Sequence, residues 1–169
     1  MEGCDFKVGD LILMKGNGTF SRLVRFSTGS DYTHVCVYIG YGAVLDVDGF
    51  RKASIRPIPS SGGFEVYRPR RRLLHFEQDA LFMEAMRLID ETKGYDWGEA
   101  LRLFFHRIGL NLKKVGHAKR HLCTELCAEL YRRIGLKVSL RSLEPESLAR
   151  LDLFERVFPH VAEDDMGMV

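Results

Sequence analysis

The hydrophobic pattern changes its period near the middle of the chain, and this change restricts the fold more than any other feature. Between Val8 and Tyr67, short apolar runs rich in Val, Ile and Tyr alternate with glycine-containing breaks, which is typical of strands joined by turns. From His75 onward, apolar residues recur every three or four positions, which indicates helices. The sequence therefore predicts strands in its first half and helices in its second half.

The same patterns set the bounds of the expected elements. The turn Gly40-Tyr41-Gly42 predicts a hairpin between its two flanking strands. The tripeptide Glu144-Pro145-Glu146 predicts a helix start, because proline is tolerated in the first turn and acids favour the positive end of the helix dipole. The expected strands are Val8–Met14, His34–Ile39, Ala43–Val47, Ser54–Ile58 and Phe64–Tyr67. The expected helices are Thr19–Phe26, His75–Thr92, Trp97–Ile108, Cys123–Ile134 and Leu148–Phe158.

Length and charge place further limits on the chain. Its 169 residues fit one domain, expected to span 1–169 with a loose acidic tail from about residue 160. Hydrophobic residues make up 46% of the sequence, enough to bury a core. The 25 basic and 23 acidic residues give a net charge of +2, which argues against a dedicated nucleic-acid-binding protein.

Neither a membrane span nor an export signal is expected. No run approaches the ~20 apolar residues that cross a bilayer. The N-terminal residues Met1 to Asp5 are acidic, whereas a secretory signal begins with basic residues and an apolar stretch. The cysteines are too few and too unevenly spaced for a disulfide scaffold, so we expect free thiols and synthesis in the cytoplasm. They are Cys4, Cys36, Cys123 and Cys127.

Cys123 lies at the expected start of a helix, where unpaired backbone N–H groups and the helix dipole stabilise a thiolate. The cationic or titratable residues Lys119, Arg120 and His121 precede it and favour the thiolate further. The thiolate is the form in which a cysteine acts as a nucleophile. The alternative is that Cys123 is a small apolar residue in a buried helical stripe. That stripe consists of Cys123, Leu126, Cys127, Leu130 and Ile134.

His34 opens the second expected strand and can serve as a base. Strand alternation places it on one face with Cys36 and Tyr38. The opposite face carries only apolar residues and is expected to face the core, which leaves His34 on the more polar face. A hydrogen-bonded structural histidine is the alternative. The apolar face consists of Val35, Val37 and Ile39.

Two acids of the next strand lie within reach of His34. If Ile39 pairs with Ala43, Asp48 lies directly opposite His34 and Asp46 lies on the diagonal. An acid beside the imidazole fixes the tautomer of the ring, which is the third part of a Cys-His-Asp arrangement. This register slightly favours Asp48, but a turn can shift a register by a residue or two.

Five short segments between roughly Gly9 and Gly135 are informative when they are taken in order. They are Gly9-Asp10-Leu11-Ile12-Leu13, Ser30 to Gly40, Val44-Leu45-Asp46, Gly94-Tyr95-Asp96 and His121 to Leu126. Together these segments resemble the circularly permuted papain-like hydrolases. These are relatives of the NlpC-type cell-wall peptidases, and lecithin:retinol acyltransferase belongs to the same permuted group. In the permuted order the strand that bears the histidine comes first and the helix that bears the cysteine comes last.

This resemblance implies a fold and a set of site residues. The fold would be α+β, with an antiparallel, partly barrel-like sheet packed on helices. Cys123 would be the nucleophile, His34 the base and Asp46 the orienting acid, since Asp46 occupies the position of the family's polar third residue. Apart from the resemblance, Tyr32 and Thr33 are candidates to contact the substrate or the oxyanion because they lie beside the histidine. Packing in the core or at its rim is the alternative for Tyr32.

Two other features have ordinary explanations. His121, Cys123 and Cys127 could ligate zinc, but a structural zinc site needs four ligands and no fourth has suitable spacing. We therefore expect no metal and no cofactor. The basic run Arg68-Pro69-Arg70-Arg71-Arg72 could bind phosphate or anionic lipid. A solvated loop is the simpler interpretation of that run.

The expected function is a thiol hydrolase that forms an acyl-thioester on Cys123. A peptidoglycan stem peptide is the favoured substrate, and access to a cell wall would require lysis or delivery in a virion. A lipid acyl hydrolase or acyltransferase is a second possibility. A third, from another class, is a catalytically silent module that assembles into a larger complex such as a phage particle. Alkylation separates the classes, because a nucleophile reacts fast and in a pH-dependent manner, whereas a buried thiol is inert.

Overall fold

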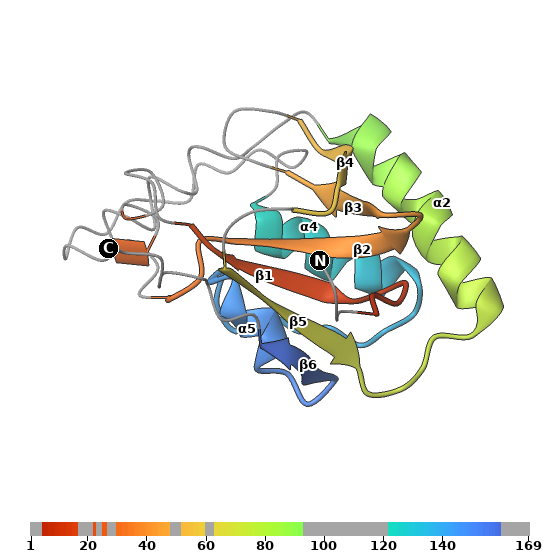
Figure 1. The fold of residues 1–169 in the computed structure, drawn as a ribbon. Coiled ribbons are helices and arrows are strands. Elements are labelled where there is room, and N and C mark those ends of the chain that lie inside the picture. The colour runs from red at the N-terminus through yellow and green to blue at the C-terminus, as the bar shows by residue number, and fades with distance from the viewer. Residues whose placement is uncertain are drawn as a thin grey trace, which may run out of the picture.

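The computed structural model describes residues 5–16, 22, 25–26, 30–47, 52–59, 63–92 and 122–159. Six strands of these ranges form one antiparallel sheet in the order β4-β3-β2-β1-β5-β6, and helices pack against it (Figure 1). The α+β class and the antiparallel sheet are therefore confirmed. Within the described residues the sheet is open rather than closed, because β4 and β6 are its edges.

The elements follow the chain as labelled in Figure 1. The strands are β1 Leu11–Lys15, β2 His34–Gly40, β3 Ala43–Asp46, β4 Ser54–Pro57, β5 Gly63–Pro69 and β6 Phe154–Pro159. The helices are α2 His75–Glu91, α4 Cys123–Arg133 and α5 Glu146–Ala149. Trp97–Ile108 and the acidic tail from residue 160 lie outside the described residues. Of Thr19–Phe26, only Arg22, Arg25 and Phe26 are described, in helical conformation.

The β2–β3 hairpin forms where the sequence predicts it. Gly40 pairs with Ala43, and the two residues between them, Tyr41 and Gly42, have φ values of 54° and 72°. Positive φ at both central positions is what a type I′ hairpin turn requires.

None of the described helices is long and apolar enough to cross a bilayer.

The first strand begins later than the expected Val8–Met14. Lys7 to Asp10 form a turn, in which the Asp10 N–H donates to the Lys7 carbonyl at 2.9 Å and the Lys7 N–H donates to Asp10 Oδ2 at 2.8 Å. Gly9 within this turn has a φ of 91°, a conformation that glycine adopts without strain. β1 therefore starts only at Leu11.

The expected helix Leu148–Phe158 is wrong. The helix start at Glu146 is present, but α5 ends after one turn and the chain continues as β6. Phe154 is buried, and the next three residues are exposed. This strand pairs with β5 from Phe154↔Pro69 to Pro159↔Glu65. Pairing with a distant strand therefore outweighs the helical pattern of the local sequence.

The face of β2 that carries His34 is less exposed than expected, because Cys36 is buried and His34 and Tyr38 are partly buried. The expected core face packs with α2 and α4 in the main hydrophobic cluster, to which Val35, Val37 and Ile39 belong. On the other face Cys36 is only 1% exposed and belongs to a smaller apolar cluster. The buried members of that cluster are Ile12, Cys36, Val44, Phe64 and Val66.

Candidate active site

Cys123 is the first residue of α4, and the helix start is fixed by its own first turn. The Leu122 N–H donates to the carboxylate of Glu125 at 3.1 Å, a bond in which a glutamate at the third helical position reaches back to the N-cap. N–H groups at the start of a helix have no partner within the helix, and the positive end of the dipole lies there. The Cys123 side chain, in a residue 7% exposed, therefore sits in a field that favours a negative charge.

The surroundings of Cys123 favour the thiolate. Burial alone would raise its pKa, but the hydrogen bond and the charge of His34 lower it. Hydrogen bonds from the Val35 backbone and the Thr124 side chain lower it further. The net pKa of Cys123 lies below that of an ordinary thiol. Of the groups in contact with it, His34 is therefore the one that contributes most to the stability of the thiolate.

His34, the first residue of β2, is held between a thiol and a carboxylate. Its Nε2 is hydrogen bonded to Asp46 Oδ1, which leaves Nδ1 as the ring nitrogen for Cys123. Burial would lower the pKa of His34, but the hydrogen bonds to Asp46 and Cys123 raise it well above the ordinary value. The lowered thiol pKa and the raised imidazole pKa have one cause, because the charged form of each group stabilises the charged form of the other.

Asp46 reaches His34 from the last position of β3. Val37 pairs with Leu45, so in the same register Asp46 lies opposite Cys36. His34 is two residues before Cys36 on the same face and therefore lies diagonally across from Asp46. Asp46 is 8% exposed, and its Oδ2 also contacts Arg56 Nη1 at 3.3 Å. Asp48, the other acid considered, lies outside the described residues.

Tyr32 and Thr33 make contacts away from Cys123 and His34, the pair that we call the dyad. Thr33 ties the start of β2 to β1, because its hydroxyl donates to the Met14 carbonyl at 3.2 Å and accepts from the Gly16 N–H at 3.0 Å. Tyr32 is 8% exposed, and its side chain is hydrogen bonded to Glu65 and Tyr67 of β5. Neither contact involves Cys123 or His34.

The remaining described cysteines differ from Cys123 in their surroundings. Burial raises the pKa of Cys36 and of Cys127 well above the ordinary value, and the charge of Cys123 raises both further. Their thiols lie 3.9 Å from the Ile12 carbonyl and 3.7 Å from the Val35 carbonyl. Both are therefore expected to be inert.

The described ranges hold no group of three or more His, Cys, Asp or Glu side chains arranged to bind a metal. His121, one of the three residues considered as zinc ligands, lies outside those ranges.

Sequence reasoning missed Arg56, Thr124 and Glu125. A glutamate three residues after the N-cap was a readable signal for Glu125. The role of Arg56 depends on the register between β3 and β4, which the sequence does not reveal.

Comparison with known proteins gives the fold and no more. No family model and no curated protein matches the sequence. Among solved structures, the chain is similar to one protein at a TM-score of 0.53 over 91% of this chain and 97% of the other. That protein is described as the metalloprotein yiiX from Escherichia coli O157:H7, DUF1105. The two sequences are 16% identical, so the likeness concerns the fold alone.

Proposed function

We propose that this chain is a thiol hydrolase that cleaves an amide or ester bond through an acyl-thioester on Cys123. One observation carries the proposal: Cys123 and His34 lie close enough for each to shift the pKa of the other, and His34 Nε2 is hydrogen bonded to Asp46 Oδ1. A nucleophile, a base and an acid that orients the base are the parts required for nucleophilic catalysis by cysteine.

The reaction follows from these groups. The Cys123 thiolate attacks the carbonyl carbon and forms a tetrahedral oxyanion, and the backbone N–H of Cys123 donates to that oxygen as part of an oxyanion hole. The carbonyl carbon then loses its amine or alcohol, which takes the proton from the His34 imidazolium. In the second half, His34 takes a proton from water, and the hydroxide attacks the thioester. Cleavage of the C–S bond releases the acid and restores the thiolate.

We assign the fold to the circularly permuted papain-like group, which includes the NlpC-type peptidases. Two features support this assignment. The histidine strand β2 precedes the cysteine helix α4 in the chain, and α4 packs against β2 in the main core. The substrate of this class that we favour is a peptidoglycan stem peptide.

The test is the capture of the acyl-enzyme. Incubation with 4-nitrophenyl acetate should add one acetyl group to Cys123, found by intact mass and by peptide mapping. Cys123→Ala should abolish the adduct. Cys127→Ala is the matched control, because Cys127 is the same residue type one turn along the same helix and should leave acylation unchanged.

Digestion of purified peptidoglycan identifies the bond. New amino and carboxyl ends in the stem peptide, detected by mass spectrometry of the released fragments, support the proposed substrate. Cleavage of ester lipids without cleavage of peptidoglycan would favour a lipid acyl hydrolase. An unreactive Cys123 with neither product would instead indicate a catalytically silent module.

A further inference from the structure

A second polar cluster lies beyond the dyad, on β1, β5 and β6. Its centre is Glu65, a residue only 4% exposed. Glu65 Oε1 contacts Lys15 Nζ at 3.1 Å and Arg156 Nη2 at 3.2 Å. Its Oε2 accepts from the Tyr67 hydroxyl at 3.1 Å, and Tyr32 is hydrogen bonded to the same carboxylate. The buried charge of Glu65 is therefore fully partnered.

This cluster carries more positive than negative charge. Lys15 and Arg156 share the single carboxylate of Glu65, so one positive charge is left over. The Lys15 and Arg156 side chains are 44% and 48% exposed, whereas that of Glu65 is 6% exposed. The acid is thus covered and both cations reach solvent. Asp31 is exposed, but in the described part of the chain it pairs with neither cation.

The strand register places this cluster close to Cys123. The Val35 backbone is hydrogen bonded to Cys123. Val35 pairs with Leu13, and Leu13 pairs with Glu65, so the three residues form one row across β2, β1 and β5. Neighbouring strands lie about 4.8 Å apart, which puts the Glu65 backbone about 10 Å from that of Val35.

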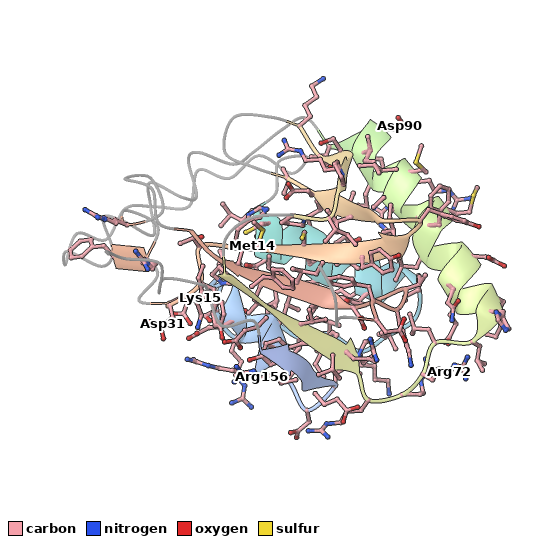
Figure 2. All side chains as sticks on the ribbon, viewed as in Figure 1. Met14, Lys15, Asp31, Arg72, Asp90 and Arg156 are labelled. Atoms are coloured by element: carbon pink, nitrogen blue, oxygen red, sulfur yellow. The ribbon has the colours of Figure 1, made fainter. Side chains whose placement is uncertain are left out.

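The cluster also faces the same way as the nucleophile. Val35, Leu13 and Cys123 belong to one core cluster, so the row lies on the face against which α4 packs. Lys15 is the next residue after Leu13 on that face of β1. Figure 2 shows Lys15 and Arg156 at the end of the sheet where α4 begins in Figure 1. The surplus charge and the thiolate therefore share one end of one face.

We propose that Lys15 and Arg156 form an anion subsite that binds a carboxylate of the substrate. This inference rests on the thiol-hydrolase function proposed above and adds a substrate class to it. An ammonium has three donors and a guanidinium five, so both retain donors beyond their contact with Glu65. Glu65 holds the two cations in place. An extended peptide rises about 3.4 Å per residue, so the carboxylate belongs two or three residues from the scissile carbonyl.

The test uses two reagents that differ only in this charge. They are N-iodoacetyl-4-aminobutyrate and its neutral carboxamide, whose chain is comparable in length to the separation of about 10 Å between the Glu65 and Val35 backbones. The second-order rate of Cys123 alkylation is measured for each reagent by intact mass at pH 7 and low salt. Because a hydrogen bond to a charged group is strong enough to change such a rate by about tenfold, we expect the wild-type protein to prefer the acid by about that factor.

Variants and controls identify the source of the preference. Lys15→Met and Arg156→Met should each lower the ratio of the acid rate to the amide rate toward one. Arg72→Met is the matched control, because it removes an exposed cation at the opposite end of the sheet (Figure 2) and should leave the ratio unchanged. High salt should also lower the wild-type ratio, since screening shortens the reach of a charge.

Iodoacetamide separates the two proposals. If it labels Cys123 no faster than an ordinary thiol, the thiol hydrolase fails and the subsite fails with it. If it labels Cys123 fast in the wild type and both variants, the site is intact, and an acid-to-amide ratio that is unaffected by Lys15→Met and Arg156→Met overturns the subsite alone. A variant that loses iodoacetamide labelling has lost its fold at the site, and the other variant then decides.

Discussion

Asp46→Asn is the substitution that most directly tests the electrostatics of the site. Asparagine keeps the size and shape of the side chain and loses the charge that faces His34. The hydrogen bond from His34 Nε2 to Asp46 Oδ1 is charge-assisted, and such a bond is worth roughly 1.5–3 kcal/mol. Asp46 is 8% exposed, so water screens the pair weakly, but Arg56 shares its carboxylate at 3.3 Å. We therefore take the lower end of that range.

A loss of roughly 1.5 kcal/mol changes an equilibrium by about tenfold. The affected equilibrium is that between the thiolate and imidazolium pair and its neutral form. Burial lowers the pKa of His34, but Asp46 and Cys123 raise it by more, so the pKa of His34 in the folded protein lies above its ordinary value. Removal of the Asp46 charge therefore lowers the pKa of His34. A less protonated His34 stabilises the thiolate less, and the pKa of Cys123 then rises.

The assay is the rate of iodoacetamide alkylation of Cys123 between pH 4 and pH 10. The wild-type rate should rise well below the pKa of about 8.5 of a free thiol, whereas the Asp46→Asn rate should fall about tenfold near pH 6. The two rates should converge above pH 9, where both proteins carry the thiolate. Asp79→Asn, an exposed acid on α2, is the control. Equal rates for Asp46→Asn and the wild type at pH 6 would refute the assignment of Asp46.

Three further substitutions test the frame that holds the site, each by urea denaturation with the free energy of unfolding as the readout. Tyr131→Phe removes the buried bond from its hydroxyl to the Gly9 carbonyl at 2.7 Å and should cost about 1–3 kcal/mol, so an unchanged midpoint contradicts it. Asp10→Ala leaves Arg68 without its carboxylate, which is fully buried, and should cost about 3 kcal/mol. Gly9→Ala should destabilise most, because φ is +91° and the new Cβ would lie 2.5 Å from Leu73 Cδ1; a loss below about 1 kcal/mol would show that the turn adapts.

The parts of the site that the sequence predicts are those with local signals. Cys123 could be placed at a helix start because the apolar stripe and the preceding residues are read from consecutive positions. His34 could be placed at a strand start for the same reason. The distance between them could not be read from spacing, since 89 residues separate the two. Only the resemblance to a permuted family suggested that the two elements meet.

The acid shows where local signals end. Alternation puts Asp46 and Asp48 on one face of a strand, and only the hairpin register separates them. The expected pair of Ile39 with Ala43 does not form, because Gly40 pairs with Ala43, but a register shift between Tyr38 and Gly40 gives Val37↔Leu45, the pairing that the expected register implies. The expected register puts Asp48 directly opposite His34, yet the hydrogen-bond partner of His34 is Asp46, which lies on the diagonal. Side-chain reach across a twisted sheet matters here as much as backbone register.

The last strand escapes prediction for a different reason. The helix start near Glu146 is encoded locally by proline and acids, and it forms. The conformation of the next segment is decided by β5, whose free edge offers hydrogen-bond partners from Glu65 to Pro69. No pattern within residues 148–158 reports that this edge exists. The same long-range pairing brings Arg156 to Glu65, so the polar cluster beside the site was equally hidden from the sequence.

The precision of the dyad is a property of the sheet more than of the two reacting residues. Thr33 fixes the start of β2 through its N–H to the Met14 carbonyl at 2.9 Å, in addition to its two side-chain bonds. Val35 fixes the start of α4 on β2 through its backbone bond to Cys123. His34 lies between these two anchors, so its backbone has little freedom to move relative to the thiol. A site held by neighbours on both sides along the chain keeps its geometry without a ligand to assemble it, so His34 and Cys123 are already in contact in the protein alone.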